Sequence, residues 1–185
     1  HSARDTFAML YDKKIIMEPK AFAVGLRIMH PQEFINNNAY GNNIYNLPAA
    51  DYKVTYKSVC TGRERGVYSF CMCPGGYVVN ASSEKNMLAV NGMSYSGRDS
   101  SNANSAMIVT VTPEDYGYGT LDGVKFQRKL EAAAYIAGEG KIPVQLLGDF
   151  KENTASTSLG AVSPCTKGEY KLTNVRSILP DYIAE

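Results

Sequence analysis

The sequence lacks tryptophan altogether and has only two histidines and four cysteines in 185 residues. Two histidines, His1 and His30, leave little material for a Ser-His-Asp triad, and no serine stands in the G-x-S-x-G turn of α/β hydrolases. Four cysteines are too few for the disulfide framework that holds small secreted domains together. These absences argue against a hydrolase of the common kinds and predict a cytoplasmic location.

An excess of charge of one sign is also missing. Nineteen Lys and Arg residues balance eighteen Asp and Glu residues, which gives a formal net charge of +1. Such a chain has no strong field with which to gather nucleic acid or an anionic membrane. No window reaches the roughly 18 uninterrupted apolar residues of a membrane span. We therefore expect neither nucleic acid nor a membrane as a partner.

Glycine-rich phosphate-binding motifs are absent as well. Gly117-Tyr118-Gly119 has no third glycine at the spacing of the dinucleotide fingerprint, and it does not join a strand to a helix. No P-loop is present. With 44% apolar residues, however, the chain can bury an ordinary core, and its length is that of one domain.

What the sequence does contain predicts an α+β fold with a mainly antiparallel sheet, one long helix and short flanking helices. The long helix is expected over residues 124–137, where Phe126 and Leu130 share an apolar stripe, Glu131 falls on the opposite side and Gly138 ends the pattern. Short helices are expected over residues 3–14, 31–38 and from 181 onward.

Strand-like runs make up most of the rest. They cover residues 22–29, 52–59, 66–72, 77–81, 87–90, 105–111 and 144–147. The four runs between residues 52 and 90 are spaced as in an antiparallel meander, and residues 105–111 are the best candidate for a central strand. Residues 91–105 are expected to form a polar loop, and residues 148–168 a long polar connection.

Two cysteines, Cys71 and Cys73, are separated by a single residue on an expected strand, so alternation predicts that both side chains lie on one face. They could share an environment, ligate a metal or form a strained disulfide. A zinc site built from Cys60, Cys71 and Cys73 would lack a fourth ligand close by. We therefore expect no metal, and two half-buried strand cysteines are the simplest interpretation.

The segment that follows, Pro74-Gly75-Gly76, could let a flat ligand approach the backbone, although a tight hairpin explains it equally well. Beyond it, small hydrogen-bonding residues surround Arg98, and loops of this composition often carry function. Arg98 could hold a carboxylate or phosphate, or it could pair with Asp99 or a neighbouring backbone carbonyl. Composition alone favours pairing within the chain.

Each end of the sequence lies at an expected helix and not in a loop between elements. The chain begins at His1, and residues 1–5 run directly into the apolar pattern of Phe7, Met9 and Leu10, as though a helix had already begun. It stops at residue 185, where a helix that Asp181 could cap is opening. We expect the sequence to be part of a longer fold.

Short segments spread over most of the chain carry a family resemblance. They are residues 1–6 (HSARDT), 24–32 (VGLRIMHPQ), 47–52 (LPAADY), 68–76 (YSFCMCPGG), 91–94 (NGMS), 102–106 (NANSA), 112–116 (TPEDY) and 145–150 (QLLGDF). Taken together and in this order, they resemble the uncharacterised FAD-dependent, or NAD(FAD)-utilising, dehydrogenases of bacteria. The shared order makes the resemblance more specific than any single motif.

The resemblance implies a two-dinucleotide-binding flavoprotein, in which an N-terminal Rossmann segment and a C-terminal return segment hold FAD and a second domain is inserted between them. Residues 1–17 would be a remnant helix of the FAD-binding domain, residues 18–165 the inserted α+β domain, and residues 166–185 the connection back. The groups that hold FAD would lie outside this sequence. FAD is therefore expected in the parent protein, with NAD(P)H as a candidate reductant, and not on this chain alone.

The resemblance also implies which residues face the flavin or its substrate. The implied cofactor-binding residues are His1, Ser2, Arg4, Asp5, Pro74, Gly75 and Gly76. The implied substrate-binding residues are Asn91, Ser94, Arg98, Asn102, Asn104 and Ser105. The candidate catalytic residues are Cys71, Cys73 and Arg98.

Two functions remain in competition. The first is a domain of an FAD-dependent dehydrogenase that forms the substrate-side wall over the flavin, is inactive alone, and has the missing FAD-binding domain and a small-molecule substrate as its partners. The alternative is a nonenzymatic RNA- or protein-binding module that uses some of the thirteen tyrosines and a patch of Lys57, Arg63 and Arg65. The nearly neutral net charge disfavours RNA.

Overall fold

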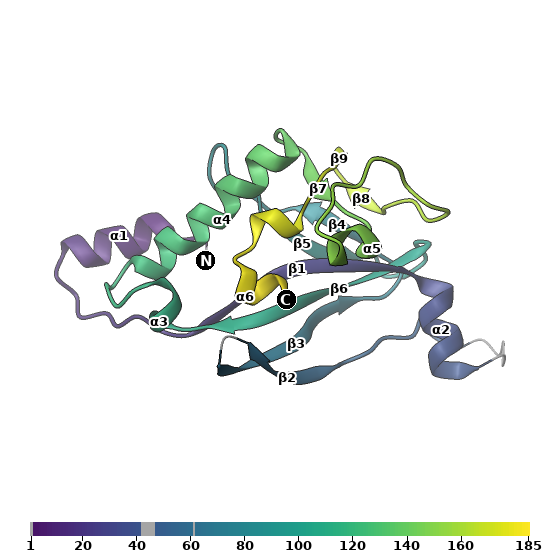
Figure 1. Cartoon of the computed structure of the whole chain (residues 1–185), viewed down its shortest axis with the longest axis horizontal. Coiled ribbons are helices and arrows are strands. Elements are labelled where there is room, and N and C mark those ends of the chain that lie inside the picture. Colours follow the sequence, from purple (N-terminus) through teal and green to yellow (C-terminus); the bar gives the residue numbers. More distant parts are fainter. Residues whose placement is uncertain (1, 42–46, 61) are drawn as a thin grey trace.

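The main layer of the molecule is a four-stranded antiparallel sheet (Figure 1). The computed structural model describes residues 2–41, 47–60 and 62–185, without the side chain of Cys60. Across the sheet the strands are β1 (Phe22–Pro31), β6 (Asn102–Val111), β3 (Arg63–Cys73) and β2 (Thr55–Cys60). The α+β class and the mainly antiparallel sheet are thus confirmed, with β6 as a central strand.

The remaining strands form two small sheets. One contains β5 (Val90–Ser94), β4 (Gly76–Asn80) and β8 (Thr166–Lys167), and the other pairs β7 (Ile142–Val144) with β9 (Tyr170–Leu172) in parallel. The expected continuous meander is therefore wrong, because β4 pairs with β5 and β8 and not with β3. A register shift between Phe70 and Cys73, followed by the turn at Pro74, directs the chain out of the main sheet.

The helices are α1 (Arg4–Asp12), α2 (Gln32–Tyr40), α3 (Pro113–Tyr116), α4 (Asp122–Gly138), α5 (Leu147–Lys151) and α6 (Asp181–Ala184), with a 3-10 turn η1 (Arg176–Ile178). The long helix α4 lies where the apolar stripe predicted it, and Glu139 ends it in a left-handed conformation. The strand expected over residues 144–147 lies earlier, in β7, and the expected polar connection opens with α5. Within the described ranges, no helix combines the length and apolar character that a membrane crossing requires.

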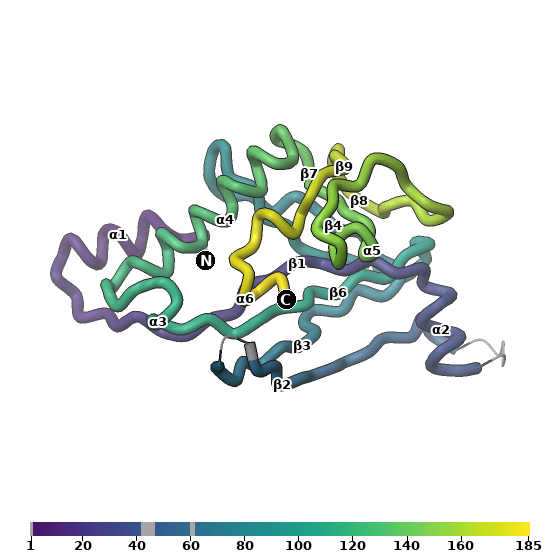
Figure 2. Tube along the Cα trace, viewed as in Figure 1, coloured from purple at the N-terminus to yellow at the C-terminus, as the bar shows by residue number. Residues whose placement is uncertain are grey.

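The core lies mainly on one side of β6. Val109 and Val111 pack with Ile183 of α6, and Phe126 of α4 packs against the same cluster. Figure 2 shows how the C-terminal segment returns from β9 to the middle of the main sheet, where α6 lies. The last residues of the chain therefore complete the core of the domain.

Helix α1 is joined to α4 by a partly buried ion-pair network. Arg4, which is only 3% exposed, places its guanidinium 2.5 Å from both Glu84 and Glu131, and Arg128 reaches Glu84 at 2.6 Å. The sequence placed Glu131 on the solvent side of α4. It is buried instead, because a charged partner from α1 covers it.

Apolar side chains remain exposed on α1 and on the segment after it. Ile16 is 92% exposed, and Met9, Tyr11 and Ile15 are also exposed. The helical spacing of the N-terminal apolar residues was predicted, but in this chain a large part of that apolar surface faces outward.

Candidate functional site

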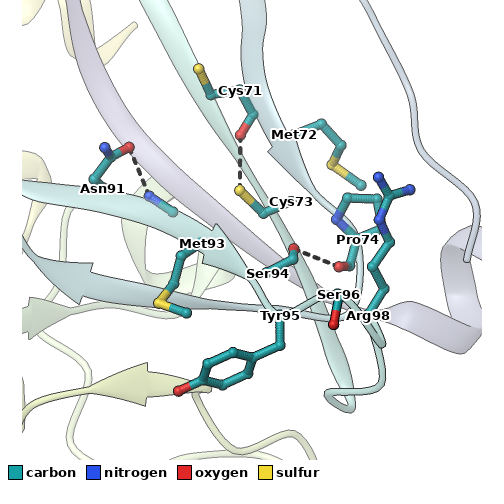
Figure 3. A pocket seen from close by; sticks show the side chains of 11 residues that line it. Cys71, Met72, Cys73, Pro74, Asn91, Met93, Ser94, Tyr95, Ser96 and Arg98 are labelled. Carbon is teal, nitrogen blue, oxygen red and sulfur yellow. Dashed lines mark hydrogen bonds between the residues drawn. The ribbon is translucent and has the colours of Figure 1, made fainter.

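A surface pocket of about 610 Å³ opens where the end of β3, the turn after it and β5 meet (Figure 3). Its lining residues are Cys71, Met72, Cys73, Pro74, Asn91, Gly92, Met93, Ser94, Tyr95, Ser96 and Arg98. Methionine and proline side chains supply apolar surface, and asparagine and serine supply neutral hydrogen-bonding groups. None of these described lining residues carries a carboxylate.

The Pro74-Gly75-Gly76 turn is buried in the wall of this pocket. A Cβ on Gly75 would lie 1.8 Å from the carbonyl oxygen of Arg98, so the missing side chain lets the chain's own backbone pass closely. The Gly75 N–H donates to Gln32 at 2.7 Å, and the Pro74 carbonyl accepts from the Ser94 hydroxyl at 2.7 Å. The turn is thus firmly held, and its contact with a cofactor stays a prediction.

Cys71 adopts a positive φ of 46° at the bulge in β3. For a residue with a side chain, such a conformation costs about 1–3 kcal/mol, and strain of this kind gathers at functional sites. The bulge turns the Cys71 sulfur away from Cys73, whose thiol donates to the Cys71 carbonyl at 3.4 Å (Figure 3). The expectation of two sulfurs on one face is therefore wrong. Both cysteines are free thiols.

No group of three or more His, Cys, Asp or Glu side chains that could hold a metal occurs among the residues whose side chains are described. The side chain of Cys60 lies outside them. Its backbone pairs with Arg63, at the opposite end of β3 from Cys73. The backbone thus keeps the third cysteine of the hypothetical zinc site away from the other two.

Arg27 of β1, which the sequence analysis missed, links the strands behind the pocket. Its Nε donates to Asn104 Oδ1 at 2.8 Å, and its Nη2 donates to the Cys71 carbonyl at 2.6 Å. Longer contacts run from Nη1 to Asn91 Oδ1 at 3.4 Å and from Nη2 to Cys73 Sγ at 3.6 Å. Three of these four partners line the pocket.

The position of Arg27 depends on a glycine. A Cβ on Gly92 would lie 2.1 Å from Arg27 Nη2 and 2.5 Å from Asn104 Oδ1. Because real atoms do not approach so closely, a side chain at residue 92 would displace the guanidinium. Asn91 and Gly92, at the start of the expected polar loop, are instead part of β5, and Gly92 leaves space for the arginine.

The charge of Arg27 has no carboxylate partner among the described residues. Burial lowers the pKa of Arg27, and the nearby Cys73 and Cys71 offset this effect only in part. By contrast, the fully buried Arg4 and Arg65 each pair with carboxylates. A partly buried cation without a counter-charge is unusual, because desolvating a charge is costly.

Arg98 lies at the rim of the pocket with a positive φ of 49°. Its side chain is exposed and extends past Pro74 (Figure 3). This side chain has no hydrogen bond or ion pair within the described part of the chain, so neither expected partner, Asp99 or a neighbouring backbone carbonyl, is engaged. Arg98 is therefore available to a ligand.

The implied substrate-binding residues divide into two groups. Asn91, Ser94 and Arg98 line the pocket, whereas Asn102, Asn104 and Ser105 do not. The latter three are buried at the start of β6, in a segment that the sequence assigned to a loop. Asn102 donates to the Ser163 carbonyl at 2.9 Å, Asn104 accepts from Arg27, and Ser105 lies 3.4 Å from the Phe70 carbonyl.

The implied cofactor-binding residues near the N-terminus lie apart from the pocket. His1 lies outside the described residues, and Ser2 and Asp5 are exposed. Arg4 is engaged with Glu84 and Glu131, neither of which lines the pocket. Their role toward a cofactor stays a prediction.

The basic patch considered for RNA binding is neutralised by neighbouring acids. Lys57 pairs with Glu64 at 2.9 Å, Arg63 pairs with Glu114 at 2.6 Å, and Arg65 pairs with an aspartate of α3. Phosphate recognition needs cations whose charge is not already satisfied. The geometry at this place therefore does not favour RNA.

Comparison with known proteins shows the family to which the chain belongs. A family model described as FAD-dependent protein, C-terminal domain-like, matches residues 21–185. An uncharacterised protein of Clostridium beijerinckii is 53% identical over 191 residues. The match takes in 100% of this chain and 35% of that protein, so the chain spans about a third of the length of its relative.

Proposed function

The chain belongs to the family described as FAD-dependent protein, C-terminal domain-like, and from this membership we propose that it is the substrate-side domain of an FAD-dependent oxidoreductase. The parent enzyme would be a dehydrogenase, and the pocket between β3 and β5 would form the wall that holds a small molecule over the flavin. The activity belongs to the parent protein, and this chain alone would not turn over substrate.

The described residues could contact one side of the flavin ring, but they would not hold the rest of FAD. The described residues contain no strand, glycine-rich turn and helix in succession that could bind the pyrophosphate. The Pro74–Gly76 backbone already bonds to the chain itself. Asn91, Ser94 and Arg98 are the groups that would face substrate or the flavin edge. FAD, when bound by the parent, supplies the electron-transfer chemistry.

The observation that carries the proposal is the uncompensated cation behind the pocket. Arg27 is partly buried, bonded to neutral groups and without a carboxylate partner in the described chain. Ionisable groups held in unfavourable surroundings next to a pocket are typical of functional sites. The strained Cys71 backbone at the same place agrees with this reading.

The exposed apolar surface at the N-terminus supports a partner domain of the same parent chain. Residues 1–17 would be part of the FAD-binding domain, residues 18–165 the inserted domain and residues 166–185 the return segment. Ile15 and Ile16, at the junction of the first two, are largely exposed here. A second domain covering them would remove apolar surface from water.

Purification of the full-length parent protein tests the proposal. We expect it to be yellow with bound flavin that NADH or NADPH reduces under anaerobic conditions, and we expect this chain to purify colourless. Full-length protein without flavin would refute the oxidoreductase function. Stoichiometric flavin on this chain alone would refute the division between cofactor and substrate domains.

A further inference from the structure

We propose that the pocket between β3 and β5 binds the carboxylate of a small organic acid, whose apolar part lies against Met72, Pro74 and Met93. The inference rests on the proposed function and names the substrate class that this site selects. Arg27 would supply a positive charge from behind the pocket wall, and exposed Arg98 a second one at the rim.

The first argument is charge balance. Each of the two fully buried arginines, Arg4 and Arg65, has a carboxylate within 2.6 Å. Arg27 has none within the described ranges, although burial disfavours its charged form. An anion in the pocket would give Arg27 the negative counter-charge that Arg4 and Arg65 already have.

The second argument concerns unused hydrogen-bond donors. A guanidinium has five N–H groups, and Arg27 makes four contacts, of which the one from Nη1 to Asn91 is long at 3.4 Å. Nη1 therefore has spare donor capacity next to a residue of the pocket wall. Donors left unsatisfied in this way favour an acceptor-rich ligand.

The third argument is the composition of the pocket. Arg98 brings a second guanidinium to the rim, and guanidinium groups match carboxylates in geometry. Met72 and Met93 offer flexible apolar surface that adapts to a hydrocarbon body. Phosphate groups are often bound at helix N-termini, and none of the described lining residues lies in a helix. The arrangement thus favours an organic acid over a phosphate ester.

An NMR titration of ¹⁵N-labelled chain tests the inference, with sodium benzoate as the probe and benzamide, its uncharged isostere, as the comparison at constant ionic strength. We expect saturable shifts of the Asn91, Gly92 and Ser94 amides with benzoate and none with benzamide. Arg98→Gln should weaken the apparent affinity for benzoate about tenfold, because one charge-assisted hydrogen bond is lost.

Matched variants separate the site from general charge effects. Arg63→Gln removes a surface arginine outside the pocket and should leave the titration unchanged. Arg27→Lys keeps the charge but loses the planar fork, and it should weaken binding to a similar degree as Arg98→Gln if the amide spectrum remains that of the native fold.

Three outcomes would overturn the inference: absence of saturable shifts with benzoate, equal shifts with benzamide, or tighter binding of inorganic pyrophosphate than of benzoate. The last would mark the pocket as a phosphate site. None of these results bears on whether the full-length parent holds flavin, so the failure of this inference and the failure of the proposed function are distinguishable.

Discussion

Arginine side chains in this protein occupy two kinds of environment. The hydrogen bond to Glu131 is the largest influence on Arg4 and raises its pKa, whereas burial is the largest influence on Arg27 and lowers its pKa. The first residue holds helices together through a completed ion pair. The second retains an unmatched charge beside a pocket, and this difference separates a structural arginine from a candidate binding residue.

Gly92→Ala should damage the site without removing any of its polar groups. The added Cβ would have to occupy the space of Arg27 Nη2, so the guanidinium would move and its bonds to Asn104 and Cys71 would weaken. We expect a loss of about 1–3 kcal/mol in the free energy of unfolding, as for other overpacked sites, measured by urea denaturation.

Gly160→Ala is the matched control, because a Cβ there meets no atom within 4 Å. It should leave the free energy of unfolding nearly unchanged. If the two alanine variants were equally stable, the close packing of Arg27 against Gly92 would be refuted.

His30 should make the protein less stable in mild acid. Its ring lies 3.0 Å from the Tyr52 hydroxyl, and burial lowers its pKa below the ordinary value of 6.5. The unfolded chain therefore takes up this proton at a higher pH than the folded chain. The contribution of His30 to stability is complete above pH 6.5 and is lost as the pH falls below it.

NMR titration of the His30 ring protons gives the test, with His30→Gln identifying the resonances. An apparent pKa at or above 6.5 would contradict the prediction. In the His30→Gln variant, the free energy of unfolding should depend less on pH over this range.

At the scale of elements, helices and strands with a regular apolar spacing could be predicted from the sequence. Elements whose form depends on contacts with distant segments could not. The stripe of α4 and the β-branched run in β6 placed these elements correctly, because burial requires just such spacing. The strand expected over residues 87–90 lies later, in β5, since the Asn91-Gly92 pair is a strong turn signal that pairing with β4 overrides. The bulge at Cys71 leaves no sequence signature, and it divides the expected meander.

The candidate site shows the same limit. Asn91, Ser94 and Arg98 were implied by resemblance and do line one pocket. Arg27 could not be found from its surroundings in sequence, because a single arginine in an apolar strand usually projects to solvent. Only the tertiary contact with β5 and the bulge in β3 makes it a partly buried cation. Its presence within the resembling segment 24–32 was the one available signal.

Arg4→Gln should release helix α1 from α4. The substitution leaves Glu131, only 9% exposed, without the cation that neutralises it, and breaking a buried pair typically costs about 3–5 kcal/mol. We expect the hydrogen-exchange protection of the α1 amides to fall sharply while that of β6 remains, because α1 can open without unfolding the sheet.

Lys57→Gln provides the control for Arg4→Gln. Lys57 and Glu64 form an exposed ion pair, which water and salt screen, so its loss should leave protection unchanged throughout the described chain. Unaltered protection of α1 in Arg4→Gln would show that the network does not hold the helix.

The ion pairs of Glu84 in this network should persist at mildly acidic pH. Arg128, with a further contribution from Arg4, lowers the pKa of Glu84 from 4.5 to about 2. A carboxylate with a depressed pKa contributes stability that is present above pH 4.5 and is lost as the pH falls toward 2. The amide resonances of α1 should therefore keep their folded positions as the pH passes through 4.5. Earlier loss, before that of β6, would contradict the assigned pairing.

At the scale of the whole molecule, the domain combines a buried core with exposed apolar side chains on α1 and the segment after it. Ile183 of α6 packs into the core, whereas Ile16, after α1, is almost fully exposed. An isolated exposed isoleucine is ordinary, but Met9, Tyr11 and Ile15 accompany it. We expect these four exposed side chains to contact the rest of the parent protein.

Ile16→Lys should therefore be harmless to this chain and harmful to the parent. Because the side chain makes little contact here, the free energy of unfolding of the isolated domain should not change. In the full-length protein the charge would be buried at a domain boundary, and flavin content after purification should fall. Ile136→Lys on α4, also exposed, is the comparison. Equal flavin content in both variants would rule out the proposed contact.

The bulge that turns Cys71 outward also gives the protein a natural attachment point. Of the three cysteines whose side chains are described, Cys71 is the exposed one, while Cys73 and Cys165 are partly covered. A maleimide fluorophore should react faster with Cys71, which lines the pocket, than with Cys73 or Cys165. The emission of such a dye would report in real time when a molecule enters, and would allow chemical libraries to be screened before any turnover assay exists.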